Sequence, residues 1–115
     1  MTLWSTLLAS AGAGVLIANA LPHAIKGLCG DSFPTPFSRP PGRGLSSPTV
    51  NLLWAFANAA LGVVLGWVAA HADVPMTTPM ITPMIMHGAR LHIALAAGAL
   101  LALAQSYGFS RKHKE

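Results

Sequence analysis

Residues 76–87, MTTPMITPMIMH, hold the side chains of this sequence that are best suited to bind a soft metal ion. The thioether sulfurs of Met76, Met80 and Met84 and the imidazole of His87 are ligands that Cu(I) accepts. Two Thr-Pro pairs interrupt the segment, and proline prevents the continuous helix that would stack these methionines on one side. Methionine is also an ordinary apolar filler where a connector lies on a membrane. The spacing favours this second role.

Histidines on either side of this segment extend the set of possible ligands. Two of them, for example His71 with His87 or His92, would suffice to ligate a haem iron, but two histidines without a further motif are weak support for a haem site. We therefore predict no bound metal and no cofactor. The alternative is a small transporter or a metal-binding or haem-binding protein with ligands among His71, Met80, Met84, His87 and His92.

The sequence shows no arrangement typical of catalysis. Cys29 is the only cysteine, and no pattern of residues around it and His23 indicates an activated thiol. A phosphate-binding loop, a Gly-x-Gly-x-x-Gly turn, a Cys-x-x-Cys pair and a His-Glu-x-x-His motif are all absent from the sequence. No Asp or Glu lies inside an apolar segment, where ion-coupled transporters usually keep one. We predict that the protein is not an enzyme.

The composition indicates the elements that position these residues. Of 115 residues, 53% are hydrophobic and 9% are charged, whereas soluble domains carry about 25% charged residues. Three apolar segments each approach the length of about 20 residues that a helix needs to cross a bilayer. A spanning backbone must satisfy its own hydrogen bonds, and the alternating strands of a barrel are absent from the sequence, so only helices are plausible. The sequence predicts an all-α membrane protein with transmembrane helices at about residues 3–26, 48–72 and 83–108.

Local signals mark the ends of these helices. Ser47-Pro48 and Thr82-Pro83 each place a capping hydroxyl before a proline at the first helical position. Pro22 is expected to end or kink the first helix, because its ring removes a backbone hydrogen bond. Residues 18–20, ANA, also fit a signal-peptide cleavage site, but no basic residue precedes them, as such a signal normally requires.

The basic residues predict the orientation in the membrane. Of the Lys and Arg residues, three lie at residues 26–43 and three at residues 111–114. The positive-inside rule places both clusters in the cytoplasm and the N-terminus outside. The sequence has a pI near 10.0, and we expect the basic residues that cause it to contact lipid phosphates. We expect no nucleic-acid partner. Residues 1–115 form one domain, with a Pro/Gly-rich cytoplasmic loop at 27–47 and a short outer connector at 73–82.

Small and amide side chains predict where the helices meet. Lipid offers helices no hydrophobic drive to associate, so small residues that permit close backbone approach and amides that bond across helices mark the contacts. An amide in a membrane span is alternatively a candidate for substrate binding. The residues expected at helix contacts are Gly14, Asn51, Asn58, Gly62, Gly66 and Gly98. Asp73 is further expected to form an ion pair with Arg90, at the outer end of the third helix.

The loop between the first two helices carries apolar and basic residues that a free linker would not need. Phe33 and Phe37 bracket a Pro-Thr-Pro sequence, and Arg39 and Arg43 follow. Rings in the headgroup layer and arginines on lipid phosphates would hold this loop at the membrane surface. Alternatively, the same four side chains form a docking surface for a partner.

Residues 18–62 combine a Pro-His turn, a Phe-x-x-Pro-Phe stretch, a Pro-Pro-Gly element, a Gly-Leu-Ser-Ser step and an Asn-Leu-Leu-Trp helix start. In these elements the chain resembles a family of uncharacterised small bacterial inner-membrane proteins. The resemblance implies a multi-pass protein of that membrane and no particular activity. We accordingly predict a structural or accessory subunit of a membrane complex, or a homo-oligomer, with the lipid bilayer and other membrane subunits or copies of itself as partners.

Overall fold

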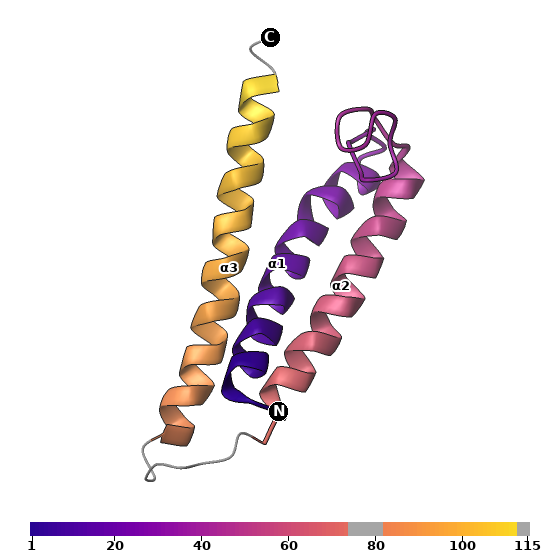
Figure 1. Cartoon of the computed structure of the whole chain (residues 1–115). Coiled ribbons are helices and arrows are strands. Elements are labelled where there is room, and N and C mark those ends of the chain that lie inside the picture. Colours follow the sequence, from indigo (N-terminus) through magenta and orange to yellow (C-terminus); the bar gives the residue numbers. More distant parts are fainter. Residues whose placement is uncertain (74–81, 113–115) are drawn as a thin grey trace.

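The computed structural model describes residues 1–73 and 82–112 and contains three long helices (Figure 1). They are α1 (Leu3–Leu28), α2 (Pro48–Ala70) and α3 (Thr82–Lys112). Each is long and apolar enough to cross a membrane, and the span within α3 is Gly88–Gly108. The described residues contain no strand beyond one isolated antiparallel bridge. The predicted fold of three transmembrane helices is confirmed, and the chain is a multi-pass membrane protein by the length and composition of its helices.

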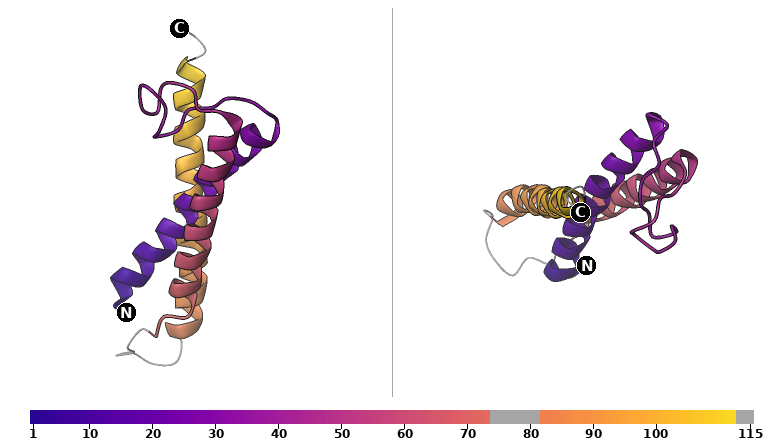
Figure 2. Two further views of the ribbon diagram at one scale, coloured as in Figure 1. Left: turned by 90° about the vertical axis from the view of Figure 1, so that its right-hand side faces the viewer. Right: turned by 90° about the horizontal axis from the view of Figure 1, so that it is seen from above.

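The first helix joins the other two. α1 contacts both α2 and α3, whereas α2 and α3 hardly contact each other. Two further views show α1 crossing its neighbours at an angle (Figure 2). The loop at residues 29–47 and the C-terminal end of α3 lie at one end of the bundle, which we call the loop face. Residue 1 and the end of α2 lie at the other end, which we call the N-terminal face.

Hydroxyl side chains cap the first two helices. Thr2 precedes α1 in an extended conformation, and its Oγ1 accepts a hydrogen bond from the Ser5 backbone N–H at 3.1 Å. Ser47 does the same for α2 by accepting from the Val50 N–H at 3.3 Å, with Pro48 in the first helical position. These bonds satisfy backbone donors that have no partner within a helix. The start of α2 predicted from Ser47-Pro48 is confirmed.

Pro22 does not end the first helix, as a proline would by itself suggest. α1 continues through Pro22 to Leu28. The residues beyond the proline pack against α2: His23 is buried on Asn51, and a Cβ at Gly27 would lie within 3.0 Å of both Leu52 and the Pro48 carbonyl oxygen. These contacts with α2 offset the hydrogen bond that proline removes.

The Pro/Gly-rich loop has a defined conformation. Its two ends are paired, because Phe33 and Ser46 exchange backbone hydrogen bonds of 3.2 and 3.0 Å. Between them the Thr35 carbonyl accepts from the Ser38 and Gly42 N–H groups at 3.2 and 2.9 Å. Gly42 has a φ of +68°, which favours glycine at this turn. The loop is a compact cap on the start of α2.

Several glycines predicted at helix contacts are used inside this one chain. A Cβ at Gly14 would overlap the Ala94 carbonyl oxygen of α3, and a Cβ at Gly98 would lie 2.9 Å from the Gly14 carbonyl oxygen. A Cβ at Gly62 would lie 3.0 Å from Ile17 of α1. Close approach of α1 to both neighbours therefore requires these three glycines.

Candidate functional site

Asn51 connects the first turn of α2 to α1 and to the loop. Its side chain is 0% exposed. The Nδ2 group donates to the carbonyl oxygens of Phe33, Ser46 and Ser47 at 3.0, 3.2 and 3.0 Å, and Oδ1 lies 2.7 Å from Nδ1 of His23. Buried polar groups are stable only when they are bonded in this way. Asn51 thereby holds the loop against both helices.

The partners of Asn51 also define the state of His23. Carbonyl oxygens only accept hydrogen bonds, so the amide nitrogen of Asn51 must face them and its oxygen must face the imidazole. Nδ1 of His23 therefore carries a proton and donates it to Asn51. The rings of His23 and Phe33 pack edge to face, with their centroids 5.2 Å apart. Thr35 and Ser46 share a second buried hydrogen bond between their hydroxyls.

The loop turns a different set of side chains outward. Phe37 is 66% exposed although its ring meets Trp54 of α2 at a centroid distance of 5.2 Å. Leu45, Arg39 and Arg43 are also exposed. Of the four side chains predicted to face lipid or a partner, Phe37, Arg39 and Arg43 lie on the outside. Phe33 is half-buried and contacts His23 instead.

A chain of amides crosses all three helices. Gln105 of α3 donates from Nε2 to Oδ1 of Asn19 in α1 at 2.8 Å, and Asn19 donates from Nδ2 to Oδ1 of Asn58 in α2 at 3.1 Å. Asn58 then donates to the Trp54 carbonyl oxygen at 2.8 Å. Each of these amide nitrogens donates to one acceptor along the row, so the orientation of all three amide groups is defined. The row joins helices α2 and α3, which have little direct contact.

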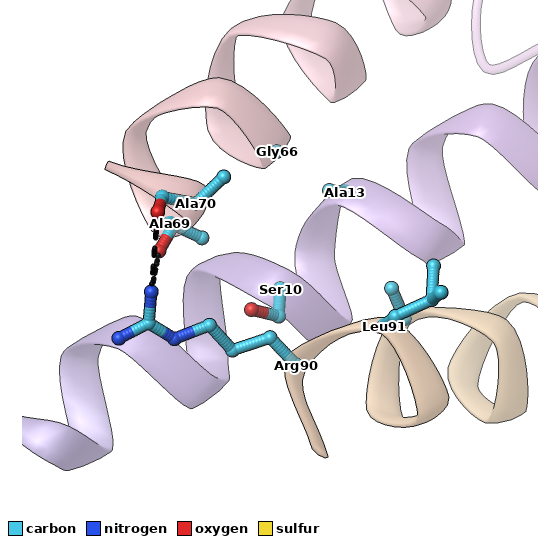
Figure 3. A pocket seen from close by; sticks show the side chains of 8 residues that line it. Ser10, Ala13, Gly66, Ala69, Ala70, Arg90 and Leu91 are labelled. Carbon is cyan, nitrogen blue, oxygen red and sulfur yellow. Dashed lines mark hydrogen bonds between the residues drawn. The ribbon is translucent and has the colours of Figure 1, made fainter. Parts of the chain in front are cut away.

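Arg90 connects α3 to the end of α2 at the N-terminal face. The residue is 8% exposed, and its Nη1 donates to the Ala69 and Ala70 carbonyl oxygens at 2.8 and 3.3 Å (Figure 3). Nη2 lies 3.5 Å from the Ala72 carbonyl oxygen. The last carbonyls of a helix have no partner within it, and they carry a partial negative charge. The end of α2 therefore binds the guanidinium.

The expected ion pair between Asp73 and Arg90 does not form in the described part of the chain. There the only ion pair joins Lys26 to Asp31 at 3.1 Å on the loop face, with both side chains largely exposed. Asp73 is exposed, whereas Arg90 is buried against α2. The carbonyl oxygens at the end of α2 bind the guanidinium, whereas the sequence suggested that the carboxylate of Asp73 would bind it.

The residues considered as metal or haem ligands do not form a common site within the described residues. His71 is exposed, stacks on Trp67 at a centroid distance of 3.9 Å, and places Nδ1 2.9 Å from the Trp67 carbonyl oxygen. His92 is exposed on α3. No group of three His, Cys, Asp or Glu residues is close enough there to hold a metal ion. Met80, and the side chains of Met84 and His87, lie outside the described residues.

Sequence analysis missed several members of these clusters. Asn19 and Gln105 are single amides in otherwise apolar helices, and this isolation was a signal that each needs a partner across the bundle. The buried roles of Thr35 and Ser46 had no such signal, because hydroxyl residues are common in exposed loops. The group around Asn51 and the row of amides together link every helix and the loop.

The comparisons with other proteins are negative. No protein-family model, curated protein or solved structure matches this chain.

Proposed function

We propose that this protein is a structural or accessory subunit of the bacterial inner membrane that works within a larger membrane complex or as a homo-oligomer. In this proposal the loop face lies in the cytoplasm and the N-terminus outside. The orientation is supported by the two clusters of Lys and Arg at residues 26–43 and 111–114, which follow the positive-inside rule. The choice of membrane rests on the resemblance in residues 18–62.

The observation that carries this proposal is the ordered loop. Residues 33–46 are held by buried hydrogen bonds to Asn51 and among themselves, yet Phe37 and Leu45 are 66% and 69% exposed. Arg39 and Arg43 are exposed in the same loop. A rigid surface with exposed apolar side chains and arginines is typical of a protein interface, since aromatic residues and Arg are enriched there. The loop loses little further entropy when a partner binds it.

Extraction of the protein in a mild detergent tests this proposal. We expect native mass spectrometry to find a homo-oligomer or a complex with a stoichiometric membrane partner. Leu45→Ala should weaken that association about tenfold if the loop is the centre of the interface, because truncation of a central interface side chain costs above about 1 kcal/mol. A clean monomer of the unaltered protein under these conditions would contradict the proposal.

A matched variant separates assembly from folding. Leu61 is 52% exposed and lies more than three turns into α2 from the loop, so Leu61→Ala removes the same side chain from a surface that we expect to face lipid. This variant should keep the complex intact. If Leu61→Ala and Leu45→Ala weaken the complex equally, the loop is not the contact surface.

A further inference from the structure

The buried guanidinium of Arg90 lines a cavity and is incompletely bonded. Among the described residues, its Nε is the only buried side-chain nitrogen or oxygen without a hydrogen-bond partner. The cavity has a volume of about 200 Å³, and Figure 3 shows Arg90 beside it with Ser10 of α1 and Gly66 of α2. Apart from Arg90 and Ser10, its lining residues are apolar or glycine. A buried, cationic N–H group without an acceptor favours a ligand that supplies one.

The charge of Arg90 is also only partly balanced. Its protein partners are three carbonyl oxygens at the end of α2, which supply a partial negative charge. In the described part of the chain no carboxylate forms an ion pair with Arg90. An anionic oxygen at Nε would complete both the hydrogen bonding and the charge.

An apolar groove continues from this cavity toward the loop face. It has a volume of about 490 Å³, runs between α2 and α3 over α1, and shares Ala13, Gly66 and Ala94 with the cavity. Its α3 wall extends from Ala94 to Ala102, which is about 12 Å along a helix. One leaflet of a bilayer core is about 15 Å deep. From Arg90 to Ala102 the cavity and groove together extend about 18 Å along α3, slightly more than the depth of one leaflet, which suits one extended acyl chain and is too short for a complete transmembrane helix.

The polar end lies at the depth of a lipid headgroup. Arg90 is near the start of the Gly88–Gly108 span and bonds the last carbonyls of α2, so it lies where two spans reach the same membrane boundary. We propose that this site binds an anionic phospholipid from the leaflet at the N-terminal face. The headgroup phosphate accepts from Nε of Arg90, and one acyl chain fills the groove between α2 and α3.

Native mass spectrometry of the purified full-length chain with added lipids tests this site. We compare phosphatidylglycerol with phosphatidylethanolamine of the same acyl chains. Both phosphates can accept from Nε, but the ammonium group of phosphatidylethanolamine already balances the charge of its own phosphate, so we expect the protein to bind phosphatidylglycerol about tenfold more tightly. Arg90→Gln should remove this preference. Lys26→Gln removes one positive charge from the end of α1 at the opposite face and should keep the preference. Equal effects of the two variants would overturn the proposal, because they would indicate diffuse attraction to charge.

A second variant tests the groove and leaves the guanidinium in place. A Cβ at Gly66 would lie 3.7 Å from Ala13 Cβ, an ordinary contact, so Gly66→Leu directs its larger side chain into the space where cavity and groove join. We expect it to reduce phosphatidylglycerol binding about tenfold. Gly108→Leu, which meets open space, should have no effect. Circular dichroism and gel filtration verify that each variant folds, and retained binding in a folded Gly66→Leu would overturn the proposal.

Two competitors distinguish the source of the anion. Inorganic phosphate at millimolar concentration should not displace phosphatidylglycerol, because it makes no contact in the groove. A fatty acid of the same chain length should compete more weakly than the phospholipid. Displacement by inorganic phosphate, or tighter binding of the fatty acid, would show that the site does not take a phospholipid.

Discussion

Replacing Asn51 with leucine is expected to release the loop from the bundle and to lower the free energy of unfolding by about 1–3 kcal/mol. The substitution removes the donor to three carbonyl oxygens and leaves the Nδ1–H of His23 without its acceptor. The three carbonyl oxygens keep backbone donors, from Ser46, Phe33 and Asn51 itself, so the main cost is the buried Nδ1–H that loses its partner, about 1–3 kcal/mol. Thermal unfolding in detergent measures the change in stability, and the rate of tryptic cleavage after Arg43 measures the release of the loop.

Asn58→Leu is the matched control for this prediction. Asn58 lies on the same helix and is also buried, but among the described residues its side chain accepts only from Asn19 and donates only to the Trp54 carbonyl oxygen. Amide bonds between membrane helices contribute about 0.6 kcal/mol on average. Cleavage after Arg43 should remain slow in this variant. Equal loop cleavage in both variants would show that Asn51 has no special role in holding the loop.

Replacing Gly14 with leucine is expected to separate α3 from α1. Even a Cβ at this position overlaps the Ala94 carbonyl oxygen, which is backbone and cannot rotate away. Forcing extra atoms into a packed contact costs about 1–3 kcal/mol and occasionally more, and a leucine here should reach the upper part of that range. The row of amides would lose its bond between Gln105 and Asn19. We therefore expect a lower unfolding temperature and a more accessible α3.

Cross-linking detects this separation directly. In a Cys29→Ser background, cysteines at Asn19 and Gln105 replace two side chains that are 2.8 Å apart at their bonded atoms, so a short bifunctional thiol reagent should join α1 to α3. Gly14→Leu should abolish the cross-link. Gly66→Ala, whose Cβ makes an ordinary contact 3.7 Å from Ala13, should retain it. A cross-link that persists in Gly14→Leu would contradict the close packing at Gly14.

The sequence predicts the number, type and approximate limits of the helices because this information is local. A long run without charges requires a helix in a bilayer, and Ser47-Pro48 marks a helix start by its own chemistry. Pro22 shows the limit of such local signals, because a proline alone does not tell whether a helix ends or continues with a kink. The helix continues past it because His23 and Gly27 pack on α2, a contact that the sequence around Pro22 does not reveal.

The candidate site was only partly predictable, because its members depend on which helices become neighbours. Asn51 and Asn58 are recognisable as buried amides, but their partners His23 and Asn19 follow from the crossing of α1 over α2. Arg90 is the clearest case. Opposite charges suggested a pair with Asp73, whereas the carbonyl oxygens at the end of α2 are closer in the folded chain and present a partial negative charge.

The position of α1 between the other helices has a further consequence. Because α2 and α3 hardly touch, the bundle depends on close contacts at Gly14, Gly62 and Gly98 and on the amide row through Asn19. The same separation leaves the groove between α2 and α3 open. The small residues thus serve packing within the chain, and the groove between the two outer helices remains available for a lipid.

Cysteine labelling in intact cells tests the membrane-spanning arrangement most directly. A membrane-impermeant maleimide is applied to cells and to inverted vesicles, with single cysteines at Ala60, Ala96 or Asp73 in a Cys29→Ser background, and with the native Cys29 alone. Ala60 and Ala96 are exposed on the isolated chain, so their protection must come from lipid or from a partner subunit within the membrane. We expect both to remain unlabelled in either preparation, position 73 to react in cells, and Cys29 to react only in inverted vesicles. Labelling at position 60 or 96, or at positions 29 and 73 from the same side, would contradict the arrangement.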